Sequence, residues 1–313
     1  MESVQLKGVV KDFGKSRILD DVNITIKEGD LMGVIGQSGS GKTTLLNLIS
    51  GFLRPSEGNV LFSSGPASHP LDLRKNLSKI KKQIGFTPQH NSFYPKLTVK
   101  ENLVHFGKLY GIKKNTLESN IKGLLNITKL SDHVNKISDQ LSGGMQKRLD
   151  IACSLIHKPK LLILDEPTAD LDPVLQKEML LFLKEINRKD VTIVIASHNL
   201  EGIEQICNKI AIIHKGKVKS FGNLEEVRKP FIKDHFTINL HSREDKDRLL
   251  DHIKNMPVEK IVDQGHSLIV YPNNPEMAIN NIIRLIREEN LSLHDLDLRK
   301  TSLNEVFEQI TVD

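Results

Sequence analysis

The hydrophobic and polar positions follow a strand period in some parts of the chain and a helix period in others. Residues 22–30, VNITIKEGD, alternate apolar and polar side chains, which predicts a half-buried strand ending in a turn. The runs LMGVIG, LLILDEP and VTIVIAS are short and almost wholly apolar, as is typical of strands covered on both faces. Helical patterns follow these runs, over residues 42–50, 173–187 and 200–208. This alternation predicts an α/β fold with a parallel sheet and right-handed crossovers.

The strand pattern disappears between residues 91 and 157, where helical patterns replace it. One helix places four apolar residues on a single face, and the stretch TLESNIKGLLNI continues the helical pattern. The sequence therefore predicts a helical insertion in an α/β domain of residues 1–230. The four residues of that face are Val99, Leu103, Phe106 and Tyr110.

A second, smaller domain is predicted over residues 236–313. Its patterns give the order β-α-β-β-α-β, which suggests a ferredoxin-like α+β layer followed by an amphipathic helix. The predicted strands include FTINL and LSLHDLDL, with a hairpin over residues 258–272 that turns near Gln264 and Gly265. The apolar helix positions are Leu249, Leu250 and Ile253, then Ile279, Ile282, Ile283 and Ile286, and finally Leu303, Val306, Phe307 and Ile310.

Composition narrows the class of protein. Hydrophobic residues make up 38% and charged residues 27% of the 313 residues, as expected of a soluble globular chain. No apolar run approaches the ~20 residues that span a bilayer, and no secretory signal is visible. Cys153 and Cys207 lack metal-ligand spacing, so we expect both to be buried thiols. The net charge of +5 is spread out without interleaved aromatics, which is weak support for nucleic-acid binding.

A glycine-rich loop between the strand LMGVI and a helical pattern fits G-x-x-x-x-G-K-[ST] in its required context. Gly39 and Gly41 allow backbone N–H groups to face a β-phosphate. Lys42 is expected to reach the β- and γ-phosphates, and the Thr43 hydroxyl to reach Mg²⁺. The loop predicts a binding site for a nucleoside triphosphate, with Mg²⁺. Its residues are Gly36, Gln37, Ser38, Gly39, Ser40, Gly41, Lys42, Thr43 and Thr44.

Two carboxylates end the apolar run LLILDEP. At the mouth of a parallel sheet, Asp165 is placed to hold Mg²⁺ through water, and Glu166 to act as general base toward the water that attacks the γ-phosphate. The alternative is that both carboxylates only cap the following turn.

The stretch LSGGMQKRLDIACSL, residues 141–155, begins with serine and two glycines and continues as an amphipathic helix. Unpaired N–H groups and partial positive charge at a helix start suit an anion such as phosphate. Taken alone, the stretch equally fits a serine N-cap beside a glycine turn.

LSGG shortly upstream of LLILDEP, together with the phosphate loop, resembles the ATP-binding-cassette (ABC) ATPases over residues 4–228. The resemblance implies a P-loop fold with a mostly parallel core sheet, an antiparallel β subdomain and a helical insertion. It also implies that Phe13 stacks on adenine, that Gln89 couples the nucleotide and Mg²⁺ to the insertion, and that His198 is the switch histidine. Asp170 and Asp172 fall in the dimer-contact segment. Singly, Phe13 also fits a core position, Gln89 a strand end and His198 a helix start.

The resemblance further implies that ATP is hydrolysed by a head-to-tail dimer. Ser142, Gly143 and Gly144 then contact the γ-phosphate held by a second cassette, identical or paralogous. Met145 stands where the family usually has glutamine, so a side-chain contact from that position is not carried over.

The exporter branch of the family is suggested by LSGGM, ENLVHFGKLYGI and SLNEVFEQI. We therefore expect the ATPase subunit of an exporter, peripheral on the cytoplasmic face of the membrane and driving a separate permease. The permease helix is expected to dock between Gln89 and residues 91–110, and the C-terminal domain to support or regulate the dimer. An importer cassette remains an alternative, as does a nucleic-acid-associated ABC ATPase. For the basic segment 74–83 the default is a solvated helical face.

Overall fold

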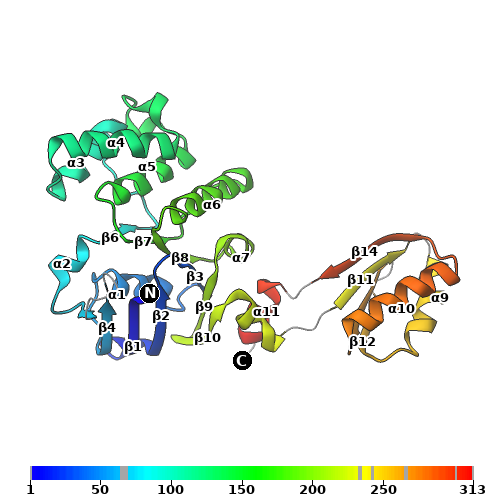
Figure 1. The fold of residues 1–313 in the computed structure, drawn as a ribbon. Helices are drawn as coiled ribbons and strands as arrows, with labels where there is room; N and C mark the ends of the chain where they lie inside the picture. The colour runs from blue at the N-terminus through cyan, green and yellow to red at the C-terminus, as the bar shows by residue number, and fades with distance from the viewer. Residues whose placement is uncertain are drawn as a thin grey trace. The chain divides into compact units, whose positions relative to one another are not determined.

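The computed structural model describes residues 2–63, 70–231, 235–240, 243–263, 267–299 and 302–311. Its helices and strands are drawn in Figure 1. Contacts divide the chain into two compact units, Met1–Val227 and Arg228–Asp313. The turn predicted near residues 264 and 265 lies outside the described residues.

A six-stranded sheet, in the order β10-β9-β3-β8-β7-β6, forms the centre of the first unit. The predicted apolar runs form β3, β7 and β8, and every residue of these strands is buried. Five of the strands pair in parallel, and β10 pairs antiparallel with β9, so the predicted mostly parallel sheet is confirmed. The strands are β3 (Leu31–Ile35), β6 (Ile84–Thr87), β7 (Leu161–Asp165), β8 (Thr192–Ser197), β9 (Lys209–His214) and β10 (Lys217–Asn223).

An antiparallel sheet in the order β2-β1-β4-β5 forms a second layer of this unit. Val22, Ile24 and Ile26 alternate inward along β2, as their spacing predicts. The helix α1 (Lys42–Ile49) shares one hydrophobic core with both sheets, which anchors the phosphate loop that precedes it. The strands of this sheet are β1 (Glu2–Phe13), β2 (Ser16–Lys27), β4 (Glu57–Phe62) and β5 (Leu71–Asp72).

The helical insertion lies between β6 and β7 and is built from α3 (Val99–Leu109), α4 (Lys114–Thr128) and α5 (Gly143–Leu155), which group together in Figure 1. Thr98 and Glu101 start α3 with a reciprocal capping box. Val99 and Leu103 are fully buried, whereas Tyr110 at the end of α3 is 36% exposed. The predicted apolar face is therefore buried only in its first turns.

The remaining helices of the unit are short, apart from α6 (Pro173–Asn187), which has the bounds that the sequence predicts. Asp172 caps α6 by accepting bonds from the N–H groups of Val174 and Leu175, both at 3.0 Å. In the basic segment, α2 (Leu77–Lys81) buries Ile80 and exposes its lysines, as a solvated helical face requires. The others are α7 (Leu200–Ile206), two residues shorter than predicted, and α8 (Leu224–Arg228).

The second unit has the predicted β-α-β-β-α-β order. Its strands pair antiparallel in the order β12-β13-β11-β14, which is the ferredoxin-like arrangement. Leu249 and Ile253 of α9 and Ile282 of α10 share one core with the sheet, so both helices cover the same face (Figure 1). The elements are β11 (His235–Leu240), α9 (Arg243–Ile253), β12 (Val258–Asp263), β13 (Ser267–Pro272), α10 (Pro275–Glu288), β14 (Leu293–Arg299) and α11 (Leu303–Thr311).

Candidate nucleotide site

The loop between β3 and α1 has the backbone that a phosphate cradle needs. Gly39 (φ 77°) and Gly41 (φ 108°) adopt left-handed conformations that other residues rarely accept. A Cβ on Gly36 would lie 2.4 Å from the Ile213 carbonyl oxygen, so only glycine fits there. No side chain caps the start of α1, which leaves its first N–H groups free to meet an anion.

Lys42 is buried at the base of this loop. Its Nζ donates to the carbonyl oxygens of Gly36 at 2.8 Å and of Gln37 at 3.1 Å. The Ser40 hydroxyl is buried with no hydrogen-bond partner. A buried ammonium held only by neutral carbonyls and an unpartnered hydroxyl both fit a site that receives an anionic ligand.

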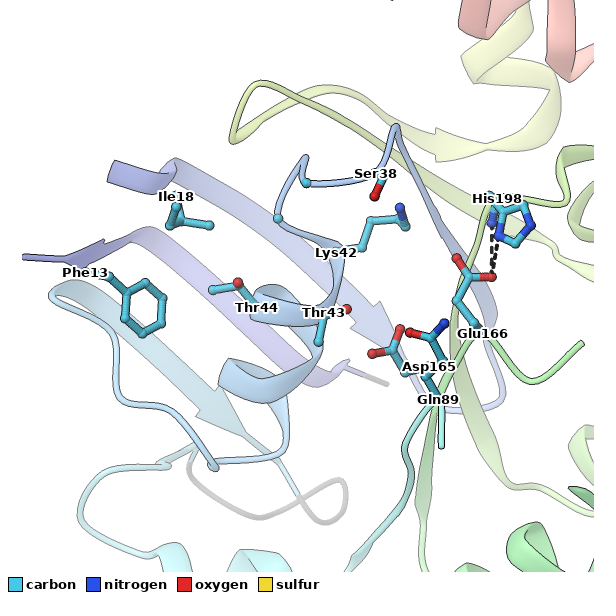
Figure 2. Close-up of a pocket in the computed structure, with 12 residues that line it drawn as sticks. Phe13, Ile18, Ser38, Lys42, Thr43, Thr44, Gln89, Asp165, Glu166 and His198 are labelled. Atoms are coloured by element: carbon cyan, nitrogen blue, oxygen red, sulfur yellow. Dashed lines mark hydrogen bonds and ion pairs between the residues drawn. The ribbon is translucent and has the colours of Figure 1, made fainter. Parts of the chain in front are cut away.

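Asp165 and Glu166 lie at the carboxyl end of β7 and point toward the loop (Figure 2). Burial raises the pKa of Asp165; the hydrogen bond with Thr43 and the nearby Lys42 charge lower it, and the Glu166 charge raises it. A hydroxyl bonded to a buried carboxylate is an oxygen-donor pair of the kind that Mg²⁺ prefers. The oxygen donors of Thr43 and Asp165 therefore fit a magnesium ion.

Glu166 is hydrogen-bonded to His198, and both residues line the same cavity. Its Oε2 accepts from the His198 ring Nδ1 at 2.9 Å and from the His198 backbone N–H at 3.3 Å (Figure 2). The Asp165 carboxylate is hydrogen-bonded to Thr43 and the Glu166 carboxylate to His198, and neither caps the following turn. The capping alternative is therefore wrong for both side chains. Glu166 also takes a left-handed φ of 49°, a strained conformation that fixes the direction of its carboxylate.

One cavity of about 510 Å³ brings the predicted residues together. Phe13 is 49% exposed, so the core alternative for this residue is wrong. Lys11 Nζ lies 4.7 Å from the centre of its ring. Gln89 follows β6 and lies beside Asp165 (Figure 2). The lining residues are Phe13, Ile18, Ser38, Gly39, Gly41, Lys42, Thr43, Thr44, Gln89, Asp165, Glu166 and His198. Of these, only Ile18 was not predicted.

Seven predicted residues do not line this cavity: Gly36, Gln37 and Ser40 of the phosphate loop, and Ser142, Gly143, Gly144 and Asp170. Ser142 is the N-cap of α5, and its Oγ accepts from Met145 N–H at 3.4 Å. Asp170 has a left-handed φ of 62°. Within one chain, the helix start at Ser142 is thus separate from the phosphate loop.

The amphipathic character predicted for residues 141–155 is wrong. The helix α5 is buried on nearly all sides, and its buried residues include Lys147, Asp150 and Ser154. These three polar residues contact the segment around Gln89, and the sequence analysis did not single them out. Their spacing of i, i+3 and i+7 places them on one helical face, but that spacing alone does not distinguish a buried polar face from a solvated one. The two thiols are buried as predicted, and no cluster of possible metal-binding His, Cys, Asp or Glu occurs among the described residues.

Two family profiles and several known proteins match this chain. The profile of a family described as ABC transporter matches residues 19–169, and that of an ATP-binding protein DrrA1-3-like, C-terminal domain matches residues 222–311. The daunorubicin resistance ATP-binding protein DrrA3 of Streptomyces coeruleorubidus is 29% identical over 99% of this chain and 96% of its own. The methionine import ATP-binding protein MetN of Clostridioides difficile is 36% identical over 72% of this chain and 70% of its own.

A solved structure shows the same fold. The dimeric post-hydrolysis state of the ATP-binding cassette MJ0796, bound to ADP and Pi, covers 71% of this chain and 98% of its own. Its sequence identity to this chain is 30% and its TM-score is 0.60.

Proposed function

This chain belongs to the ABC transporter family, whose ATP-binding cassettes hydrolyse ATP, and on that premise we propose that it is the ATPase subunit of an exporter, working as a dimer around two MgATP. One observation carries the proposal. The phosphate loop, both carboxylates, Gln89 and His198 converge on a single cavity, whereas the LSGG helix start lies outside it.

Within the cavity each residue has a proposed part. The loop from Gly36 to Thr44, which includes Lys42, binds the β- and γ-phosphates. Phe13 stacks on the base. Thr43, Gln89 and Asp165 would hold Mg²⁺, which would supply positive charge to neutralise the transferring phosphoryl group. Glu166 takes the proton of the attacking water, and His198, bonded to its Oε2, orients that carboxylate.

The second half of each site is proposed to come from a partner cassette. Ser142, Gly143 and Gly144 begin a thirteen-residue helix whose first N–H groups are suited to a γ-phosphate. Asp170 lies in the segment proposed to contact the partner. Hydrolysis removes the bridging charge, and the dimer opens.

Lys42→Ala is expected to weaken MgATP binding by about ten- to a hundredfold, because one charge-assisted contact to phosphate is lost. Titration calorimetry with the full chain measures this, and Lys122→Met on the exposed face of α4 is the control. Unchanged affinity in Lys42→Ala would contradict the phosphate-loop assignment.

Export rather than import is favoured by how much of the chain each known protein matches. The match to the daunorubicin resistance protein continues through the second unit, whereas the match to the methionine import protein covers 72% of the chain. None of the helices in the described part of the chain is long and apolar enough to cross a membrane. On the basis of the family, we propose that a separate permease carries out transport and that this chain lies at the cytoplasmic face of the membrane. The described residues carry no feature that favours the nucleic-acid alternative.

The permease is proposed to dock in a groove of about 710 Å³ beside the helical insertion. Phe52 is 58% and Leu109 68% exposed there, beside Phe106 and Tyr110, so the groove offers an apolar floor to a short helix. Leu109→Glu is expected to abolish co-purification with the membrane permease while leaving basal ATPase activity intact. Retention of the permease by this variant would contradict the assignment.

For the C-terminal unit we propose a role in supporting the closed dimer. Its compact core and separate fold permit such an added function, and a DrrA-like C-terminal profile covers it. Deleting residues 236–313 is expected to weaken ATP-dependent dimerisation, measured by analytical ultracentrifugation. Unchanged dimerisation and ATPase activity would refute the role.

A further inference from the structure

The helix α5 carries a stripe of polar side chains where a buried helix face is normally apolar. Lys147 is 8% exposed, Asp150 0% and Ser154 7%, and their spacing places them on one face. We call these residues the polar stripe. It faces residues 86–92, the segment that leaves β6 and contains Gln89.

Each member of the polar stripe bonds to a different point of that segment. Lys147 Nζ donates to the carbonyl oxygen of Gln89. Asp150 Oδ1 accepts from the backbone N–H of Ser92 at 3.0 Å and also from its hydroxyl. Ser154 Oγ donates to the carbonyl of Phe86 at 2.8 Å. The backbone is therefore held before, at and after Gln89, while the Gln89 side chain remains free to line the cavity.

Burying the charged side chains of the polar stripe costs free energy. Burial lowers the pKa of Lys147 and raises the pKa of Asp150, so the interior disfavours both charges. Asp150 Oδ2 is moreover buried with no hydrogen-bond partner. Well-packed apolar residues at such positions are often neutral or stabilising relative to buried charges. What the hydrogen bonds of these side chains fix directly is the position of the Gln89 segment relative to α5.

That geometry joins two sites. Ser142 lies at the N-terminal end of α5, outside the cavity of its own chain. Further along the same helix, Lys147 binds the backbone of Gln89, whose side chain lies beside Asp165 (Figure 2). Lys147 also feels the charge of Asp170, in the proposed dimer-contact segment. The hydrogen bond from Lys147 Nζ to the Gln89 carbonyl oxygen therefore connects a cavity residue directly to α5.

We propose that Lys147 and Asp150 are positioning residues that lock Gln89 to α5, so that nucleotide in a protomer's own cavity sets where its Ser142 helix start meets the partner's nucleotide. The inference rests on the proposed dimeric function and adds the element that couples its two sites. Neither residue lines the cavity, so their effect on hydrolysis is indirect.

The test compares Lys147→Met with Lys147→Arg in the full chain. Methionine keeps the buried chain length and loses the donor, whereas arginine keeps a donor for the Gln89 carbonyl. We expect Lys147→Met to lower kcat at least about tenfold, with the Kd for MgATP of the monomer changed less than about twofold. Lys147→Arg restores much of the lost kcat, and Lys122→Met, on the exposed face of α4, matches wild type. The melting temperature of each variant distinguishes a folding defect from a loss of kcat in a folded protein. If Lys147→Met fails to fold, Asp150→Asn is the second variant.

A second measurement separates the coupling from the dimer itself. In a Glu166→Gln background, Lys147→Met should raise the ATP concentration for half-maximal dimerisation several-fold while the monomer Kd stays constant. Glu166→Gln alone remaining monomeric would overturn the dimeric function and this inference with it. Dimerisation of Glu166→Gln with no shift on adding Lys147→Met, together with wild-type kcat in both Lys147→Met and Asp150→Asn, would overturn the positioning role only.

Discussion

Glu166→Gln is expected to reduce kcat for ATP hydrolysis by about 10²- to 10⁴-fold, the usual contribution of a positioned general base. The amide has nearly the shape of the carboxylate but cannot accept the proton of the attacking water. In the structure Glu166 is 8% exposed and its Oε2 is bonded to His198, so no other carboxylate of the cavity stands in the same place. Asp165 is engaged with Thr43 instead.

Nucleotide binding should survive this substitution, because the phosphate loop and Lys42 are unchanged. ATP that binds without being hydrolysed then keeps the two cassettes closed. Size-exclusion chromatography with light scattering is expected to give a dimer in saturating MgATP and a monomer without nucleotide. Glu185→Gln, an exposed carboxylate of α6, is the control and should hydrolyse ATP normally. A Glu166→Gln protein that stays monomeric in ATP would count against the shared site.

Much of the core was predictable because its signals are local. The start of α6 follows from Asp172 as N-cap and proline in the first turn. The strands β3, β7 and β8 are buried on both faces, so their sequences are continuously apolar. The phosphate loop is equally local, since glycine is needed at particular backbone angles and lysine at one spacing.

The elements that escaped prediction depend on contacts distant in sequence. The strand β1 has no clean alternation because its pairing with β2 shifts register between Leu6 and Val9, which moves later apolar residues to another phase. The polar stripe of α5 was not predicted from the sequence for a related reason. A buried lysine or aspartate is intelligible only once the Gln89 segment, more than fifty residues away along the chain, is known to lie against α5.

Ser142→Arg is expected to abolish steady-state ATP hydrolysis, a loss of about 10²- to 10³-fold of the kind seen when a preorganised donor to the reacting group is removed. A bulky cation at the start of α5 would block the approach of that helix to a partner's phosphate. Monomer affinity for MgATP should stay at the wild-type value, since Ser142 does not line its own chain's cavity. Loss of the N-cap bond to Met145 costs about 1 kcal/mol, which a melting curve separates from the loss of turnover.

Mixing this variant with Glu166→Gln gives the sharpest form of the experiment. In a mixed dimer, the pocket of the Ser142→Arg chain keeps its own Glu166 and receives an intact Ser142 helix start from the Glu166→Gln chain. One pocket is therefore complete, although each homodimer is inactive. A single-turnover measurement should find a burst of hydrolysis approaching one ATP per mixed dimer and none from either variant alone. Absence of a burst in a mixture shown to form mixed dimers would mean that each cavity acts without its neighbour, because only contributions in trans permit such complementation.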